Sequence, residues 1–250
     1  MKIKEIYAFL DSIAPYSTQC SWDNSGFMCG DMNNDVSAVM LCLDCTNDVI
    51  EKATDNGCNV IICHHPLIFA PVKRVYGETA LYNAIKNDIT VISAHTNLDM
   101  ADGGVNDALC GKLGLSDCEK LIAEDVPLMR MGNITEQSAD DFASFVAKTL
   151  GNGAEVYDSG RKVRRVAVCG GAGGEYVSDA FYAGCDTFVT GEAKHHERLE
   201  AMNLGINLIV AGHFSTEIPV IEKLSEKLSE AFSDMKIYIA TEKSPCKTVV

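Results

Sequence analysis

The chain has 250 residues, of which 47% are hydrophobic and 22% are charged. This composition is typical of globular proteins and excludes a disordered or collagen-like chain. The formal net charge is −14, which argues against non-specific nucleic-acid binding and against anionic lipid surfaces, because both are negatively charged themselves.

The eleven cysteines are scattered without a repeated spacing. The first residues carry charges and lack the apolar run of a signal peptide. No apolar stretch approaches the ~18 residues that a membrane span requires. We therefore expect a cytoplasmic protein with reduced cysteines and no membrane segment.

The elements follow one another in alternation. A helical apolar face predicts a first helix over residues 2–13. Apolar runs predict buried strands at 36–43, 59–63, 89–94, 163–169, 187–190, 207–211 and 236–240. Caps and periodicity predict helices at 46–57, 79–87, 102–113, 138–151 and 221–232. Residues 116–136 are less regular. The alternation predicts an α/β fold with mixed, largely parallel sheets.

The sequence also resembles itself. The segments Val39–Cys42 and 57–59 recur 127 residues later, at Val166–Cys169 and 184–186. We interpret this as a duplicated α/β unit, with related halves at about 1–115 and 138–250 and a connector at 116–137. The two halves are expected to form one compact layered unit over 1–250. Chance matching of small residues is the alternative.

Six histidines lie at or just beyond the C-terminal ends of predicted strands: His64, His65, His95, His195, His196 and His213. In open α/β sheets this edge binds ligands. Pro66 favours an extended backbone at His65, and consecutive extended side chains point apart. Two adjacent imidazoles therefore suit two metal ions better than one.

Carboxylates accompany the histidines at a fixed spacing. His213 and Glu217 are four residues apart, with Glu217 expected in the first turn of the final helix, and His95 and Asp99 repeat the spacing. Asp44 lies at the same sheet edge. Nitrogen and carboxylate ligands together suit Zn, Fe, Mn, Co or Ni better than Ca or Mg. Taken singly, each histidine could instead cap a loop.

Five segments carry a resemblance to a known family: 21–27 (SWDNSGF), 64–69 (HHPLIF), 94–99 (AHTNLD), 190–196 (TGEAKHH) and 212–217 (GHFSTE). The chain resembles the NIF-three-like dinuclear metal-centre family, whose members are often named GTP cyclohydrolase I type 2 homologues. Longer members insert an extra domain between the halves, for which the 116–138 connection is too short.

The resemblance implies a ligand set for two divalent metal ions. His64, Asp99 and Glu217 would hold one ion, and His65, His213 and Glu217 the other. The resemblance also places His95 and residues 190–196 in the same cavity. It further implies a toroidal homohexamer.

These observations favour a metal-dependent hydrolase in which Glu192 or His95 carries the proton. The family name indicates a nucleotide such as GTP, or another phosphorylated small molecule, as substrate. The alternative is a non-catalytic metal-binding scaffold or metal carrier, since the ligand set is common to both.

Two further segments are candidates for contacts with a nucleotide. Backbone N–H groups of Gly171 and Gly173, in the glycine-rich loop 170–174, can hold a phosphate, although a plain tight turn fits the loop equally well. Trp22 can stack on a base, or it can be a hydrophobic plug.

Overall fold

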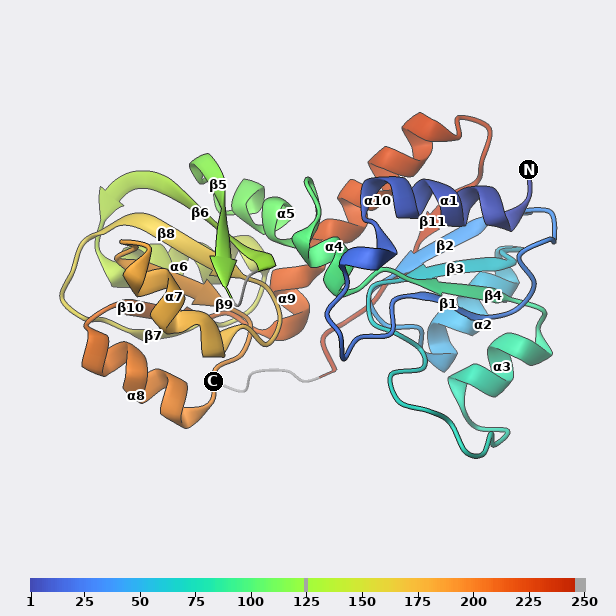
Figure 1. Ribbon diagram of the computed structural model, residues 1–250, viewed down its shortest axis with the longest axis horizontal. Helices are drawn as coiled ribbons and strands as arrows, with labels where there is room; N and C mark the ends of the chain where they lie inside the picture. Colours follow the sequence, from blue (N-terminus) through green and yellow to red (C-terminus); the bar gives the residue numbers. More distant parts are fainter. Residues whose placement is uncertain (124–125, 246–250) are drawn as a thin grey trace. The chain divides into compact units, whose positions relative to one another are not determined.

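The computed structural model describes residues 1–123 and 126–245. The chain divides into two compact units, one formed by Met1–Asp102 with Ile221–Glu242 and the other by Gly103–Val220 with the end of the chain from Lys243. Each unit is built around a sheet of its own (Figure 1). Within the described ranges, no helix has both the length and the apolar character needed to cross a membrane.

The first unit holds a five-stranded sheet. Its strands, in spatial order, are β1 (Gly26–Cys29), β4 (Thr90–Ser93), β3 (Val60–Cys63), β2 (Val39–Cys42) and β11 (Ile237–Ile239). All pair in parallel except β1, which is antiparallel to β4. Cys42, Cys63 and Ser93 are in register, so β2, β3 and β4 end at one edge of the sheet.

Helices cover both faces of this sheet (Figure 1). On one face lie α1 (Ile3–Ile13) and α10 (Pro219–Ala231), where the rings of Phe9 and Phe232 meet at 5.3 Å. On the other lie α2 (Asn47–Asp55) and α3 (Ala80–Lys86). The Thr46 side chain caps α2 as predicted. The short helices η1 (Tyr16–Thr18) and α4 (Thr96–Met100) complete the unit.

The second unit holds a six-stranded sheet. Its strands, in spatial order, are β5 (Ser116–Ala123), β6 (Val126–Gln137), β8 (Val163–Cys169), β9 (Thr187–Thr190), β10 (Asn207–Val210) and β7 (Glu155–Tyr157). The three strands β8, β9 and β10 are parallel, and the other pairs are antiparallel. Cys169, Thr190 and Val210 are in register at the end of the parallel strands.

Further helices and a 3-10 turn belong to this unit. On one face of the sheet, α5 (Val105–Lys112) and α6 (Ala139–Leu150) bury Leu109 and Phe142 against the strands. The helices α7 (Val177–Tyr182) and α8 (His195–Leu204) pack on each other and on β9 and β10. The 3-10 turn η2 (Gly174–Tyr176) precedes α7, and α9 (His213–Glu217) follows β10.

The predicted α/β class with mixed, largely parallel sheets is confirmed. The strand order β1-β4-β3-β2 of the first sheet matches β7-β10-β9-β8 of the second, with the same antiparallel edge strand. In chain order, a helix precedes each antiparallel edge strand, α1 before β1 and α6 before β7. A short helix also follows the third parallel strand of each set, α4 after β4 and α9 after β10. From this correspondence we propose that the repeat is a duplication.

The strands β1 and β7 and the helix α8 were not among the predicted elements, and two expectations differ from the structure. The connector at 116–137 contains the paired strands β5 and β6, whose register shifts twice and so breaks the alternation that marks a strand. Glu217 is the last residue of α9 and does not lie in the first turn of the final helix. A new helix begins at Pro219, which lacks the N–H that would continue α9. Residues 221–242 belong to the first unit.

Candidate metal centre

In the first unit, the chain leaves β3 directly into two adjacent histidines. The backbone N–H of His64 donates to the Cys42 carbonyl (3.1 Å), and that of His65 to the Leu43 carbonyl (2.9 Å). These bonds continue the parallel pairing of β2 and β3 beyond the strand ends. Both imidazoles are therefore placed by the sheet itself, and not by a free loop.

Three imidazoles gather at this edge. The His64 and His65 rings lie 4.9 Å apart, and the His95 ring lies 5.1 Å from His64 and 5.5 Å from His65. Each offers a ring nitrogen, and these three nitrogens lie within 4.8 Å of one another. His95, which the resemblance places only as a lining residue, thus joins the same group as the expected ligands His64 and His65.

Each of these imidazoles is anchored through Nδ1, which lies within hydrogen-bond distance of an oxygen. The pairs are His64 with the Ala94 carbonyl (2.8 Å), His65 with Asp44 Oδ1 (2.9 Å) and His95 with Asp23 Oδ1 (2.7 Å). Carbonyl and ionised carboxylate oxygens only accept, so Nδ1 carries the proton and Nε2 keeps its lone pair. Metal-ligating histidines have this arrangement, with a second hydrogen bond that fixes the tautomer.

Asp99, in α4, faces the buried His64. Its Oδ1 lies 3.6 Å from His64 Nε2. Because the Ala94 carbonyl holds the His64 proton at Nδ1, a neutral His64 presents a lone pair to a carboxylate. Two such groups attract each other only through a cation between them, either a metal ion or a proton. The pair therefore fits a divalent cation.

Asp23 organises the loop that holds His95. Its carboxylate is fully buried and accepts hydrogen bonds from His95 Nδ1, from the Thr96 N–H (3.1 Å) and hydroxyl (2.5 Å), from the Ser25 hydroxyl (2.9 Å) and from the Asn24 N–H (2.7 Å). Burial alone would raise the pKa of Asp23, but the hydrogen bonds from His95 and Thr96 outweigh burial and hold this pKa well below its usual value.

Glu242 fixes the loop that carries Asp44. The two oxygens of its carboxylate accept from the backbone N–H groups of Leu43 (2.8 Å) and Asp44 (3.0 Å). Asp44 in turn holds His65 through Nδ1. Burial raises the pKa of Glu242, and the nearby Asp44 carboxylate adds to the effect, while the two N–H groups oppose it.

The second unit carries an arrangement of the same kind. His213 Nδ1 lies 3.0 Å from Glu192 Oε1, and its Nε2 lies 3.2 Å from Glu217 Oε2. Glu217 is buried at the end of α9, whereas the Glu192 side chain is 59% exposed. The His213 imidazole thus faces the buried Glu217 carboxylate through Nε2, while its Nδ1 contacts the second acid, Glu192. These residues can contribute ligands to a metal ion.

The glycine-rich loop packs against this pair. A Cβ atom at Gly171 would overlap Glu217 Oε1 and would lie 3.2 Å from His213 Nε2. The N–H groups expected to bind phosphate already donate inside the unit, from Gly171 to the Thr216 hydroxyl (3.0 Å) and from Gly173 to that of Thr190 (3.1 Å). The structure thus favours the tight-turn alternative over the phosphate anchor.

Trp22 is 60% exposed, which argues against the hydrophobic-plug alternative. Its ring lies 6.0 Å from the His95 ring and 5.9 Å from that of Phe69, which is itself 55% exposed. Phe69 also lies 6.1 Å from His95. Two aromatic side chains therefore border the histidine group, and the sequence reasoning had not singled out Phe69.

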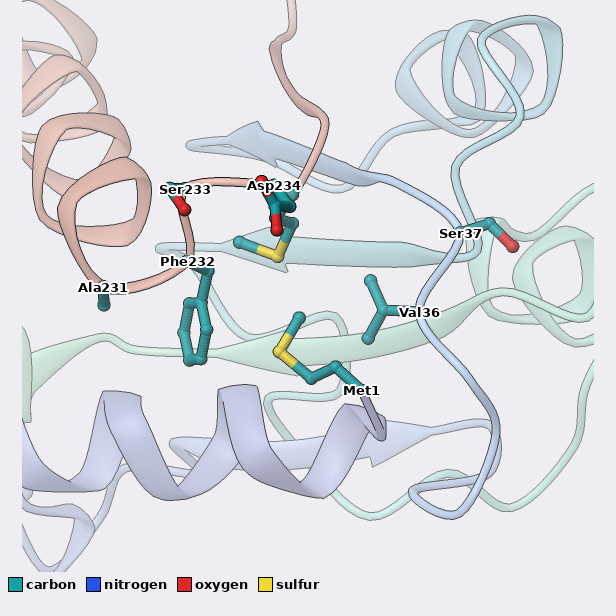
Figure 2. A pocket seen from close by; sticks show the side chains of 8 residues that line it. Met1, Val36, Ser37, Ala231, Phe232, Ser233 and Asp234 are labelled. Carbon is teal, nitrogen blue, oxygen red and sulfur yellow. The ribbon is translucent and has the colours of Figure 1, made fainter.

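The remaining histidines and the described pocket lie apart from these groups. His195 and His196 are exposed at the start of α8 and belong to neither group. A pocket of about 490 Å³ lies in the first unit, where Figure 2 shows the side chains of Met1, Val36 and Phe232. None of the predicted site residues lines it, and its lining mixes apolar side chains with Ser37, Ser233 and Asp234.

Sequence reasoning missed the two acids that support the histidines. Asp23 lies within the SWDNSGF segment, but it is 72 residues from His95. Glu242 follows the last strand and is 198 residues from Asp44. No local spacing signals either contact. The available signal was that Asp23 lies inside the SWDNSGF segment. Within that segment, only Trp22 was interpreted as a candidate site residue.

Comparisons with known proteins show the family of the chain. The model of the Duf34/NIF3 (NGG1p interacting factor 3) family matches residues 1–247. The "GTP cyclohydrolase 1 type 2 homolog" of Clostridium perfringens is 32% identical, over 97% of each chain. Among solved structures, the hypothetical protein SA1388 of Staphylococcus aureus (28% identity, TM-score 0.92) and a Bacillus cereus protein related to NIF3 (25%, 0.89) each cover 100% of this chain, which covers 99% of theirs. The chain therefore belongs to the Duf34/NIF3 family.

Proposed function

We propose that this chain binds two divalent cations and is a metal-dependent hydrolase. The observation that carries the proposal is the common orientation of its imidazoles. Each keeps Nδ1–H on a fixed acceptor, while Nε2 of His64 and of His213 faces a carboxylate. A histidine that only caps a loop gains nothing by turning the lone pair of Nε2 toward a carboxylate, whereas a cation between the two groups attracts both.

The ligand assignment follows the family resemblance. It gives His64, Asp99 and Glu217 to one cation, and His65, His213 and Glu217 to the other. Neutral imidazoles with carboxylates suit Zn, Fe, Mn, Co or Ni. Cations bound in this way supply Lewis-acid chemistry and lower the pKa of water. The protein's own contribution is to hold the ligands in place through Nδ1.

Two residues are proposed to move protons. Asp23 fixes the orientation of His95, so that Nε2 of His95 can accept a proton beside the other two imidazoles. Glu192 is largely exposed and contacts His213, so it can exchange protons with bulk water. We assign these roles to His95 and Glu192 as catalytic residues of the proposed reaction.

The proposed substrate is a nucleotide such as GTP, or another phosphorylated small molecule. The names of the relatives support this class, and so does the exposed Trp22 ring beside His95, since a flat apolar ring can stack on a base. From the family resemblance we also propose a toroidal homohexamer, which light scattering on the purified protein can test.

The ligand assignment is tested by measuring metal content. Elemental analysis of the purified chain should give two cations per chain, and His65→Ala and Asp99→Ala should each lower that value. His196→Ala is the matched control, because it removes an exposed imidazole outside both groups. Unchanged metal content in both ligand variants would refute the assignment.

The hydrolase is tested separately on metal-loaded protein. Turnover of GTP or of a nucleotide phosphoester should disappear on chelation, return on reloading, and be lost in Glu217→Ala. If the protein retains its metal but turns over none of a broad panel of phosphorylated compounds, the hydrolase proposal fails. The non-catalytic scaffold or carrier then takes its place.

A further inference from the structure

In the first unit, a single peptide group lies between His65 and Glu242. Its carbonyl oxygen belongs to Leu43 and accepts from the backbone N–H of His65 at 2.9 Å. Its N–H belongs to Asp44 and donates to Glu242 Oε1 at 3.0 Å. A peptide group is rigid and planar, so its carbonyl and its N–H move together. The backbone of His65 and the carboxylate of Glu242 are therefore joined through one rigid group.

The imidazole of His65 is held from the same place. Its Nδ1 lies 2.9 Å from Asp44 Oδ1. The Asp44 side chain is 44% exposed, so its direction depends strongly on the backbone that carries it. That backbone is fixed by Glu242, whose two oxygens accept from the successive N–H groups of Leu43 and Asp44, and such convergent N–H groups hold an anion firmly. His65 thus depends on Glu242 at two points, through its backbone N–H and through its ring.

Glu242 is itself placed by the sheet. It follows β11, and the parallel pairing of β11 with β2 continues past the strand, because the Ala240 N–H donates to the Leu41 carbonyl at 2.8 Å. The Thr241 carbonyl accepts from the side chain of a lysine on α2, also at 2.8 Å. All three residues of the segment 240–242 therefore make a hydrogen bond that holds the segment at this edge of the sheet.

The neighbouring imidazole is held by other groups. His64 Nδ1 lies 2.8 Å from the Ala94 carbonyl, and the His64 backbone N–H donates to the Cys42 carbonyl at 3.1 Å. Both acceptors are backbone atoms at the ends of β4 and β2, and neither contacts Glu242 through these bonds. A change at Glu242 should therefore disturb His65 and leave His64 in place.

We propose that Glu242 is a positioning residue for the cation assigned to His65, and that docking of the segment 240–242 and binding of this cation strengthen each other. The proposal rests on the two-cation site proposed above. Linkage makes the effect reciprocal, so a docked segment that raises the affinity for the cation is itself held more firmly once the cation is bound. Residues behind metal-ligating histidines typically change metal affinity by about 10–100-fold. Because Glu242 acts one step further out than Asp44, we expect about tenfold, and for one cation of the two.

Titration of the metal-free full chain with Zn²⁺, in competition with a chromophoric chelator, tests the proposal. The wild type should bind two ions. In Glu242→Gln the new NH₂ group faces a backbone N–H, so one of the two affinities should fall about tenfold while the other stays unchanged. Glu230→Gln is the matched control, because it removes the same charge from an exposed position near the end of α10 in the same unit. Both of its affinities should equal those of the wild type.

A double-mutant cycle shows whether Glu242 acts through Asp44. Asp44→Ala should weaken the same cation, because His65 loses the partner of its Nδ1. Adding Glu242→Gln should then cost less than it costs alone, since one of the two connections to His65 is already lost. A purely structural role of Glu242 would instead give costs that add in full, and that result would contradict a positioning role.

Hydrogen exchange on the wild type measures the reverse effect and needs no variant. Zn²⁺ should slow exchange of the Leu43 and Asp44 amides and of the Ala240 amide, which belongs to no proposed ligand. Unchanged exchange at Ala240 would overturn the proposal, even where Glu242→Gln fails to fold. If the wild type binds two Zn²⁺ ions and Glu242→Gln binds both as tightly, or loses both equally, this proposal fails while the metal site stands. If the wild type binds fewer than two, the proposed two-cation site itself fails, and the role of Glu242 fails with it.

Discussion

Replacing Asp23 by asparagine isolates the buried carboxylate that supports His95. The two shapes are nearly equal, but one carboxylate oxygen becomes an NH₂ group. Oδ1 accepts from the Asn24 N–H and from His95 Nδ1, and Oδ2 accepts from the Thr96 N–H and from two hydroxyls. Hydroxyls can rotate to accept, but backbone N–H groups cannot. Either orientation of the amide leaves at least one buried donor facing another donor.

The expected cost follows from this count. An unsatisfied buried donor costs about 1–3 kcal/mol, and the hydrogen bonds that remain lose the strengthening effect of the charge. We therefore expect Asp23→Asn to lower the free energy of unfolding by about 2–4 kcal/mol. Denaturant unfolding followed by circular dichroism measures this change, and an unaltered slope would show that the unfolded state is unaffected.

Asp55→Asn is the matched control, because it removes the same charge at the exposed end of α2. Its unfolding midpoint should stay close to that of the wild type. If Asp23→Asn unfolds at the same denaturant concentration as Asp55→Asn, the carboxylate of Asp23 does not organise the loop in the way argued here. The hydrogen bonds to His95 and Thr96 would then be energetically unimportant.

Two further predictions concern Asp23 and the glycine-rich loop. Because the folded pKa of Asp23 lies below the ordinary 3.8, its stabilising contribution is complete above that value and is lost as pH falls toward the folded pKa. The stability gap between wild type and Asp23→Asn should therefore narrow in unfolding curves taken at successively lower pH below about 5, and a constant gap would contradict the assignment. Gly171→Ala should release metal, because the new Cβ atom would overlap Glu217 Oε1. Gly151→Ala is the matched control, since the backbone φ is similar at the two positions (+64° and +66°) but a Cβ atom at Gly151 meets nothing within 4 Å. It should therefore strain only the backbone and retain metal. Equal metal content in these two variants would exclude a steric role for Gly171.

The sequence predicted the histidine edge because its causes are local. Short apolar runs mark β3 and β4, and a side chain that directly follows a parallel strand must lie at the carboxyl edge of the sheet. His64, His65 and His95 are therefore placed by their position in the chain alone. The direction of each imidazole is not local, since it depends on acceptors such as Asp23 and Asp44.

The features that the sequence could not predict depend on contacts between residues that are far apart in the chain or on where one element ends and the next begins. β5 and β6 were missed because bulges interrupt the alternation on which strand prediction relies. The position of Glu217 was misjudged because α9 ends at Glu217 and α10 begins at Pro219, and periodicity alone does not separate two abutting helices. The contact of Glu242 with the Leu43 and Asp44 N–H groups joins the two chain segments that form the first unit, and no motif records such a contact.

The first unit is assembled from both ends of the chain, since β11 pairs with β2 and Glu242 reaches back to Asp44. During synthesis, all of Gly103–Val220 is made, and leaves the ribosome, ahead of the last strand of the first sheet. The later-encoded unit can thus finish folding while the earlier one still waits for its closing strand, the reverse of the usual N-terminal-first order. A released chain truncated after residue 220 should therefore resist protease in its second half and be cut in its first.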